Sequence, residues 1–379
     1  MSIKNKLVNT TKDCYTALRF AARFPSQVMK INQLIDKPSY YPEMPRKSRQ
    51  EMWKDNFKWL CKDWELNTFY TSYGLDIKGF RNPDDYIPHR HFCKMRNAGN
   101  QKNLKTPTGK YNYLALLRDK YAFSAYLSST IGEQYVVKSI GIVDRNGIFF
   151  CDRKEWADIE ELLTLEGRWV FKIIDGECGD GVFLVTIAGG KIKTGSDEYT
   201  PKEFAAKFVN KNRWLIQPVI EQHEALKAFK TRSVNTIRAV TIRGKSGSIG
   251  VFNAFLRLGA DDKSFVDNRA LGGYGVGIDL EKGTLMKYGY QHDSFGGKAS
   301  QHPLSGIVFE GYEIPCWKET IDLIRNAHRQ FYELQSIGWD IVITKDGPVL
   351  LEGNDDWEVG GPQDTYGGLK KKWNELVNA

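Results

Sequence analysis

Two apolar segments near the C-terminus, joined by a short polar turn, constrain the fold of this chain more than any other feature. They are Gly338–Thr344 and Pro348–Asn354, and residues 345–347 between them read Lys-Asp-Gly. A loop of three residues that ends in glycine is typical of a β-hairpin, because glycine readily takes the left-handed conformation that such a turn needs. The sequence therefore predicts an antiparallel hairpin close to the end of the chain.

The register expected for this hairpin, centred on Asp346, brings two carboxylates together. It sets Asp340 opposite Glu352 on one face, with β-carbons about 5 Å apart, and places Asn354 further along the same face. Opposed like charges are unfavourable unless a cation lies between them, and two carboxylates with one amide oxygen suit Mg²⁺. We therefore predict that these three residues bind Mg²⁺; the alternative is an exposed hairpin with scattered acids. The same register pairs Thr344 with Pro348 and Val342 with Leu350.

The size and composition of the chain indicate a cytoplasmic protein with more than one lobe. Its 379 residues exceed the usual size of a single core. The six cysteines are scattered without a C-x-x-C pair, which favours free thiols over disulfides or a zinc site. No apolar run approaches the roughly 20 residues of a membrane span, and no secretory signal is evident. The net charge of +8 favours anionic partners such as nucleotides, acidic glycans, nucleic acid or a membrane surface.

Residues 1–110 are basic, rich in aromatic side chains and predicted to be mostly helical. Ser48 and Glu51 form a capping-box pattern at the start of one helix. In the first 35 residues basic and apolar side chains are interleaved, and Pro25 is expected to break or kink a helix there. A helix packed on the main body is favoured over one lying on the inner membrane surface. One helical stripe is predicted to belong to a core: Trp53, Phe57, Leu60, Cys61 and Trp64.

The remainder of the chain is rich in predicted strands. Strands in runs with occasional helices argue for an α+β body of mostly antiparallel sheets. Helices are predicted over 112–131, Pro201–Val209 and Glu319–Gln335. Besides the hairpin, strands are predicted over Tyr135–Val143, Arg168–Ile174, Gly181–Ile187, Arg213–Val219, Val234–Ile242, Ile249–Leu258 and Thr284–Tyr288.

A glycine-rich loop joins two of these strands and is a candidate phosphate-binding element. Gly176, Gly179 and Gly181 would let backbone N–H groups approach phosphate oxygens, and Lys172 on the entering strand could reach the same phosphates. A strand follows the loop, which argues against a P-loop or a dinucleotide-binding fingerprint, since both need a helix there. No H-R-D or D-F-G motif supports a protein kinase. A flap-like hairpin over a nucleotide is predicted, and ordinary turns are the alternative.

Another segment could hold the adenosine part of a nucleotide. An apolar strand ends at Gln217, so that Gln217 and the backbone of Val219 could contact an adenine edge, while Glu224 could accept from ribose hydroxyls. A strand end that leads into a surface helix explains the same residues equally well.

Two arginines in consecutive predicted strands suggest a positively charged floor. Arg238 shares its strand with Asn235, and Arg257 lies near the end of the next strand. Arginine inside strands favours anionic partners such as a triphosphate or an acyl-phosphate. Surface arginines paired with nearby acids are the competing explanation.

Two loops are candidates for the substrate side. Asn268 precedes the glycine pair at 272–273, which would permit close approach of a ligand or belong to an ordinary loop. His302 begins the loop His-Pro-Leu-Ser-Gly, which could line an acceptor site, although a single histidine beside proline is usually structural.

Taken together, these motifs resemble the ATP-grasp superfamily over roughly residues 110–360. The spacing Asp-x₁₁-Glu-x-Asn, ending at Asn354, is similar to that of glutamate-adding and D-alanine:D-alanine ligases. The blocks Ser233–Arg238, Val266–Asn268 with the following glycine pair, His302–Gly306 and Ile337–Asp340 resemble more specifically the sugar-transfer-associated ATP-grasp family.

The resemblance implies a role for each matching residue. It implies two α+β subdomains that grip ATP, 111–220 with the glycine-rich flap and 221–379 with the Mg²⁺ site, after an accessory region 1–110. Asp355 and Asp356 stand where relatives often have small residues, which leaves open whether an extra acid joins the metal site. The implied roles are phosphate binding by Lys120 and Lys172, adenosine binding by Gln217, Val219 and Glu224, one or two Mg²⁺ at Asp340, Glu352 and Asn354, charge stabilisation by Arg238 and Arg257, and substrate contacts at Asn235, Asn268 and His302.

The activity implied by the resemblance is ATP-dependent ligation of a carboxylate to an amine through an acyl-phosphate, in the biosynthesis of a cell-surface polysaccharide or sugar conjugate. Its partners would be a small or glycan-borne carboxylate and an amine, with no nucleic acid, in the cytoplasm or at the inner membrane surface. Phosphorylation of a sugar-type hydroxyl and a non-catalytic anion-binding module are the alternatives.

Overall fold

The computed structural model describes residues 3–104, 113–176, 181–209, 212–260, 272–292, 294–295 and 297–379. The chain divides into two compact units. Unit 1 comprises Met1–Met95, Asp293–Lys298 and Glu358–Lys371, and unit 2 comprises Arg96–His292, Ala299–Trp357 and Lys372–Ala379. The predicted division at residues 110 and 220 stays a prediction. Among the described residues, no helix is both long and apolar enough to cross a membrane.

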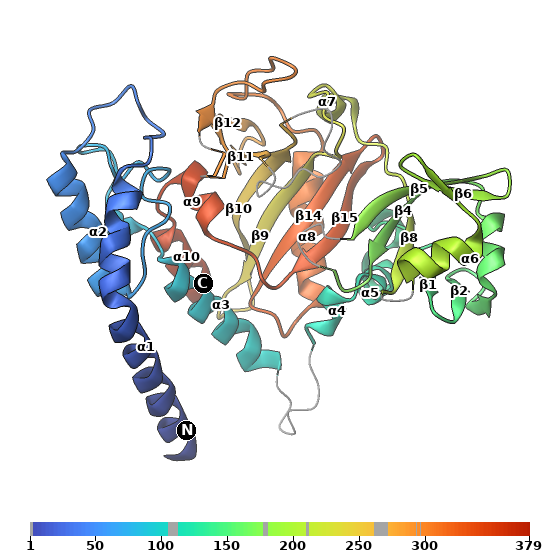
Figure 1. Cartoon of the computed structure of the whole chain (residues 1–379), viewed down its shortest axis with the longest axis horizontal. Coiled ribbons are helices and arrows are strands. Elements are labelled where there is room, and N and C mark those ends of the chain that lie inside the picture. Colours follow the sequence, from blue (N-terminus) through green and yellow to red (C-terminus); the bar gives the residue numbers. More distant parts are fainter. Residues whose placement is uncertain are drawn as a thin grey trace. The chain divides into compact units, whose positions relative to one another are not determined.

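Unit 1 is built from helices and irregular segments. Its core contains Ile31 and Ile35 of one helix, Leu60 of the next, and Leu75 from the connecting segment that follows. In Figure 1 these two helices are the blue pair α1 and α2. The elements that begin in this unit are α1 (Ile3–Ile35), α2 (Arg49–Asp63), η1 (Pro83–Asp85), α3 (His89–Leu104), α9 (Gly360–Tyr366) and α10 (Lys370–Asn378).

The N-terminal predictions are partly confirmed. Ser48 and Glu51 form the expected capping box of α2. The expected break at Pro25 is wrong, because α1 is assigned as one helix on both sides of it. The predicted core stripe is wrong at its end: Cys61 is exposed, and Trp64, 40% exposed, is the left-handed residue that ends α2.

The first sheet of unit 2 is antiparallel and carries the glycine-rich hairpin. Its strand order is β3-β2-β1-β8-β4-β5-β6-β7. Aromatic side chains from Phe171, Phe183, Phe204 and Trp214 pack together in its core. The strands are β1 (Gly141–Asp144), β2 (Gly147–Phe150), β3 (Glu155–Ala157), β4 (Gly167–Ile173), β5 (Val182–Ala188), β6 (Lys191–Thr194), β7 (Asp197–Tyr199) and β8 (Trp214–Pro218).

The second sheet contains the C-terminal hairpin at one edge. Its order within unit 2 is β12-β11-β10-β9-β14-β15, again antiparallel (Figure 1). Its strands are β9 (Thr236–Arg243), β10 (Ile249–Leu258), β11 (Tyr274–Ile278), β12 (Leu285–Tyr290), β14 (Ser336–Thr344) and β15 (Gly347–Asn354), and a short strand β13 spans Lys298–Ala299. The other helices are α4 (Ala115–Arg118), α5 (Lys120–Ile131), η2 (Glu133–Tyr135), η3 (Ile159–Thr164), α6 (Pro201–Phe204), η4 (Ala205–Val209), α7 (Glu224–Lys227) and α8 (Trp317–Gln330).

The predicted α+β class with mostly antiparallel sheets is confirmed, and several boundaries are corrected. The helix predicted over 112–131 is broken at Asp119, whose carboxylate accepts from the backbone N–H groups of Tyr121 and Ala122 and so caps α5. The strand predicted over Tyr135–Val143 begins only at Gly141. The helix predicted to reach Gln335 ends at Gln330, because the next strand starts at Ser336.

The register of the C-terminal hairpin contains two departures from the expected one. Thr344 pairs with Gly347, so the turn has two residues instead of three. Leu350 pairs with Ile341 and Pro348 with Ile343, which makes the predicted partners Val342 and Thr344 wrong. A bulge at Leu351 then restores the predicted pair Asp340–Glu352. The extra residue shifts the alternation of side chains, so that Leu350 points into the core while Glu352 points to the opposite face.

Candidate functional site

A row of charged side chains crosses three neighbouring strands of the second sheet. Arg238 of β9 pairs with Asp340 of β14, which pairs with Glu352 of β15. Directly paired residues in antiparallel strands share a face, so the three side chains lie together. The neighbours Ile237 and Trp339 belong to the core on the other face. The alternation of strand residues therefore separates an apolar face from a charged one.

Asp340 is the centre of this row and is held by two arginines. The Arg238 guanidinium donates to both carboxylate oxygens, with 2.8 Å between Nη2 and Oδ2. The guanidinium of Arg257, on β10, lies 3.1 Å from Oδ2 and also donates to the Thr236 hydroxyl at 2.8 Å. The two arginines thus lie close together, as predicted. Both also pair with an acid, which was the competing explanation for arginine in these strands.

The two facing carboxyl groups have opposite pKa shifts. Burial raises the pKa of Asp340, but the positive charges of Arg238 and Arg257 outweigh burial and hold it below its usual value. For Glu352, burial, the adjacent charge of Asp340 and a hydrogen bond with that carboxylate all raise the pKa. The acid pair is thus one ionised carboxylate beside a second carboxyl group that favours its proton.

Two lysines come from the first sheet and the helix beside it. Burial lowers the pKa of Lys172 on β4, the charge of Glu352 opposes this shift, and the charge of Lys120 adds to it. Lys120 is the first residue of α5, and its ammonium donates to the carbonyl oxygen of Gly176. The predicted phosphate-binding lysines therefore lie within electrostatic reach of each other and of the acid pair.

The glycine-rich loop joins two antiparallel strands, as predicted, since β4 pairs with β5. Gly181 has a φ of +68°, and a β-carbon there would lie 2.2 Å from the Ile173 side chain. Glycine is required at this position on both grounds. Gly176 donates its N–H to the Ile173 carbonyl. Gly179 lies outside the described residues.

The predicted adenosine contacts lie at and beyond the end of β8. Gln217 is buried beside β4, where it pairs with Val170 and its amide donates to the Val137 carbonyl at 3.3 Å. Val219 follows the strand and is 42% exposed. The Glu224 carboxylate, on α7, is exposed and lies 2.8 Å from the ammonium of Lys227. Gln217 thus shares the sheet with Lys172, whereas Glu224 pairs locally.

The donor set at the acid pair fits a hard divalent cation. Asn354 lies beside Glu352, with 3.5 Å between its amide nitrogen and Oε1. The carboxylates and the amide supply oxygen donors, which Mg²⁺ prefers. A cation would also replace the proton that Glu352 favours beside Asp340, since it neutralises the same charge.

The two predicted substrate residues that the structure describes, Asn235 and His302, form their hydrogen bonds with residues outside the row. Asn235 is fully buried, and its amide donates to the Leu226 carbonyl and accepts from the Thr231 hydroxyl, which ties α7 to β9. His302 is fully buried, and its Nε2 lies 2.8 Å from the Gly259 carbonyl. Asn268 lies outside the described residues. Their assignment as substrate contacts stays a prediction.

The two acids after Asn354 are already paired. Arg118 holds Asp355 through two hydrogen bonds of 3.0 and 2.8 Å, and Arg96 forms an ion pair with Asp356. Both carboxylates are thus engaged by arginine, as the Asp340 carboxylate is.

One residue near the row was missed by sequence reasoning. Asn253 of β10 is fully buried, and neither its amide nitrogen nor its amide oxygen has a partner in the described part of the chain. It pairs with Val240, two positions from Arg238 on the same strand. Its signal was a lone amide flanked by apolar residues on both sides in the strand. An unpaired buried amide marks a place for water or a ligand.

The part of the chain that contains the charged row, the glycine-rich hairpin and the two antiparallel sheets matches a known protein family. Residues 100–376 match the family described as sugar-transfer associated ATP-grasp. The chain belongs to this family. The resemblance drawn from the motifs is therefore confirmed, and with it the ATP-grasp fold. None of the curated protein sequences matches this chain.

Solved structures of other ATP-grasp proteins are distantly similar to this family member. N5-carboxyaminoimidazole ribonucleotide synthetase from Thermotoga maritima is 10% identical, with 68% of this chain and 48% of that chain covered and a TM-score of 0.36. N5-carboxyaminoimidazole synthetase from Staphylococcus aureus, complexed with ADP, is 12% identical, with 73% and 58% covered and a TM-score of 0.38. D-alanine-D-alanine ligase from Coxiella burnetii is 12% identical, with 69% and 53% covered and a TM-score of 0.33. The chain spans about half the length of these proteins.

Proposed function

We propose that this protein is an ATP-dependent ligase that joins a carboxylate to an amine through an acyl-phosphate. The observation that carries the proposal is the row of Arg238, Asp340 and Glu352, in which Asp340 is buried and the other two are half-buried, with Lys172 and Lys120 within electrostatic reach. Such a site provides positive charge for a triphosphate and oxygen donors for a divalent cation. Membership of the ATP-grasp family supports the same chemistry.

In the first step a carboxylate oxygen of the acceptor attacks the γ-phosphorus of ATP. The bond from that phosphorus to the β,γ-bridging oxygen breaks, which yields ADP and an acyl-phosphate. Lys172 and Lys120 would hold phosphate oxygens, and Arg238 and Arg257 would stabilise the charge of the transferred group. The protein contributes positioning and charge neutralisation, so no protein nucleophile is required.

In the second step an amine nitrogen attacks the acyl carbon and phosphate leaves, while the nitrogen gives up a proton. Asp340, Glu352 and Asn354 would hold Mg²⁺, which would neutralise phosphate charge when bound. Gln217 and the Val219 backbone would hold the adenine. Glu224 would contact the ribose, a role that the family resemblance implies for its position after Gln217 and Val219.

We further propose that the acceptor belongs to cell-surface glycan biosynthesis. The family description associates these proteins with sugar transfer. A uronic acid, free or linked to a nucleotide or lipid, offers the carboxylate, and an amino acid or small amine offers the nitrogen. Such substrates would be used in the cytoplasm or at the inner membrane surface, so we propose that the enzyme acts there.

The test is to follow ADP release with ATP, Mg²⁺ and panels of uronic acids and amines, and to identify the product by mass. An amide supports the ligase. A stable phosphate ester would instead support the kinase alternative. Asp340→Asn and Glu352→Gln are expected to lose turnover, whereas Asp322→Asn, at an exposed ion pair on α8, is expected to keep it. Full turnover by either of the first two variants would contradict the assigned roles.

A third outcome is binding without chemistry. Salt-dependent binding of nucleic acid or acidic glycan, with no nucleotide binding by calorimetry, would favour an anion-binding module. Such a module would have no use for the facing carboxyl groups of Asp340 and Glu352.

A further inference from the structure

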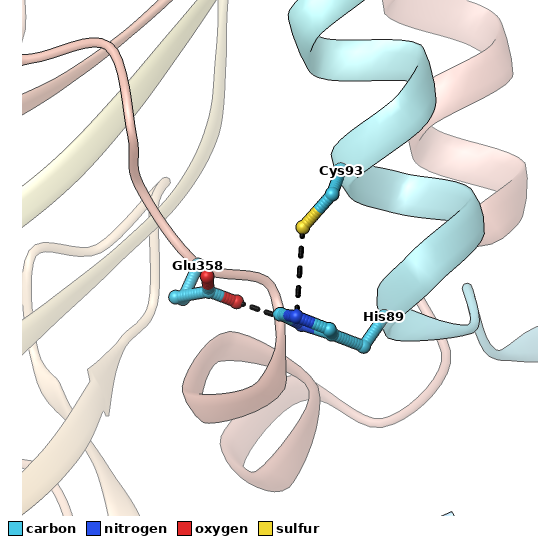
Figure 2. Close-up of side chains that lie close together, drawn as sticks. All are labelled: His89, Cys93 and Glu358. Atoms are coloured by element: carbon cyan, nitrogen blue, oxygen red, sulfur yellow. Dashed lines mark hydrogen bonds and ion pairs between the residues drawn. The ribbon is translucent and has the colours of Figure 1, made fainter. Parts of the chain in front are cut away.

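Unit 1 holds a cluster of three different metal-ligating side chains that the proposed reaction does not use. His89 and Cys93 lie four residues apart on the first turns of α3, so their side chains share one face of the helix. Glu358 comes from the segment that precedes α9. Figure 2 shows the imidazole ring lying between the thiol and the carboxylate. One ligand atom from each residue lies within 4.8 Å of the other two.

Both nitrogens of the imidazole ring are engaged in this cluster. The Cys93 sulfur lies 3.5 Å from Nε2 of His89, and a Glu358 oxygen lies 2.9 Å from Nδ1 (Figure 2). Two ligands of a tetrahedral Zn²⁺, with bonds of about 2.0–2.1 Å to nitrogen and about 2.3 Å to sulfur, stand roughly 3.5 Å apart. The separation of Nε2 and Sγ therefore equals the edge of such a tetrahedron.

The cluster is assembled by buried contacts that do not involve its own members. The Gln363 side chain of α9 is fully buried, accepts from the backbone N–H of Ile87 at 2.7 Å and donates to the Ile87 carbonyl at 3.1 Å. It also donates to the Tyr73 hydroxyl at 3.0 Å. Ile87 stands two residues before His89, so these bonds fix the segment around Glu358 against the start of α3. The three donors are thus preorganised by the fold.

A second carboxylate lies near the start of α3. The Glu65 carboxylate accepts from the Arg90 backbone N–H at 2.8 Å and acts on the charge of His89. Nearby negative charge stabilises a divalent ion and its thiolate complex.

We propose that Nε2 of His89 and the thiolate of Cys93 bind a borderline-soft divalent cation of the Zn²⁺ type, while Glu358 orients the imidazole through Nδ1, at a site separate from the predicted Mg²⁺ site. Nitrogen and sulfur donors suit Zn²⁺, whereas Mg²⁺ takes oxygen donors. Two protein ligands leave two positions for water. The bound ion would stabilise the first turns of α3 and with them unit 1. Cysteine spacing alone does not indicate this arrangement, because Cys93 has a histidine and a distant glutamate as neighbours and no second cysteine.

The decisive experiment is a titration of the full-length, metal-free protein with Co²⁺, followed by absorbance. A thiolate ligand gives an intense sulfur-to-cobalt charge-transfer band, and tetrahedral coordination strengthens the visible bands. We expect one equivalent of Co²⁺ to develop both, and Zn²⁺ to displace it. Cys93→Ser should abolish the charge-transfer band, His89→Gln should abolish stoichiometric binding, and Glu358→Gln should weaken binding roughly 10- to 100-fold. The matched control is Cys61→Ser, because Cys61 is an exposed thiol on α2.

The absorbance readout does not depend on any activity with ATP. The outcome for the metal site can therefore be distinguished from the outcome for the proposed function. Helix content is measured for each variant by circular dichroism, to separate loss of ligand from loss of fold. In addition, Zn²⁺ should raise the thermal midpoint of the wild-type protein and leave that of the folded variant Cys93→Ser unchanged. A charge-transfer band that survives Cys93→Ser, or no band in the wild-type protein, would overturn the proposal.

Discussion

Asp340 shows how one buried carboxylate can depend on its neighbours. It is 2% exposed and receives hydrogen bonds from Arg238 on both oxygens. Removing one partner of a buried ion pair leaves an uncompensated charge, which costs far more than the pair contributes when intact. The row could be predicted in part from the sequence, because the hairpin turn aligned Asp340 with Glu352. The contact with Arg238 could not, since nothing local indicates that β9 lies beside β14.

Replacement of Arg238 by methionine is expected to lower the free energy of unfolding by about 3 to 5 kcal/mol, because the Asp340 carboxylate loses its two-bond partner. The double variant Arg238→Met/Asp340→Leu should recover only part of this loss, since Arg257 then loses the Asp340 carboxylate as its ion-pair partner. Urea unfolding of the two single variants and the double variant measures the coupling. A loss below about 1 kcal/mol in Arg238→Met would contradict the pairing.

Burial disfavours the charged form of Lys172, a half-buried residue of β4. Burial lowers its pKa, and Lys120 adds to the shift. Lys172→Met should therefore keep or slightly raise stability while it weakens ATP binding by roughly 10- to 100-fold, as a charged hydrogen bond to phosphate is lost. Calorimetry and urea unfolding measure the two effects. Lys193→Gln, at an exposed ion pair on the same sheet, is the matched control. Unchanged ATP affinity in Lys172→Met would remove this residue from the site.

At the scale of elements, the bulge at Leu351 has the largest consequence for the site. The expected hairpin had a three-residue turn and no bulge, whereas the structure has a two-residue turn and one bulge. The two differences offset each other, and the Asp340–Glu352 pair is the same in both. The sequence gives no local signal for the bulge, because Leu350 and Leu351 are equally apolar and only packing decides which enters the core. The correct acid pair was therefore predicted through an incorrect register.

The helix cap at Asp119 positions Lys120 and offers a test at the same scale. Asp119→Ala should lower stability by about 1 kcal/mol, because two N–H groups of α5 lose their acceptor. It should also raise KM for ATP, since Lys120 is the first residue of that helix. Ser48→Ala removes a comparable cap from α2 in unit 1 and is expected to lower stability by a similar amount with KM unchanged. Equal KM values for the two variants would argue against a role of Lys120 in phosphate binding.

At the scale of the whole molecule, the class of fold and the family were predictable, and the strand order was not. Motifs such as Ser233–Arg238 and the terminal hairpin consist of residues close together in the chain, so they can be recognised in a single sequence. The adjacency of β8 to β1 and β4, or of β9 to β14, arises from contacts between distant segments. The helix break at Asp119 was missed because the apolar periodicity continues on both sides of it.

Stability of the whole molecule should fall on mild acidification because of a buried histidine. His328 of α8 accepts from the Thr241 hydroxyl through Nδ1 and donates through Nε2 to the Leu334 carbonyl, which fixes the neutral ring. Burial lowers its pKa to about 3. In the unfolded chain the pKa of this histidine is near 6.5. The neutral ring therefore makes its full contribution to the free energy of unfolding above that pH. As pH falls from about 6.5 toward 3, stability declines by up to about 1.4 kcal/mol per pH unit.

The measurement is urea unfolding at a series of pH values. Burial also lowers the pKa of His302, so His328→Gln should reduce the slope between about pH 6.5 and 5 without removing it. The absolute stability of the variant is not the readout, since it also loses two hydrogen bonds. An unchanged slope would mean that His328 does not stay neutral in the folded protein.

The facing carboxyl groups of Asp340 and Glu352 are tested most directly by calorimetry with a non-hydrolysable ATP analogue, with and without Mg²⁺. We predict that Mg²⁺ strengthens binding of the analogue to the wild-type protein and to Asp322→Asn, and that Glu352→Gln abolishes this strengthening while weaker, metal-independent binding remains. Equal strengthening by Mg²⁺ in Glu352→Gln and the wild-type protein would contradict a metal site at the acid pair.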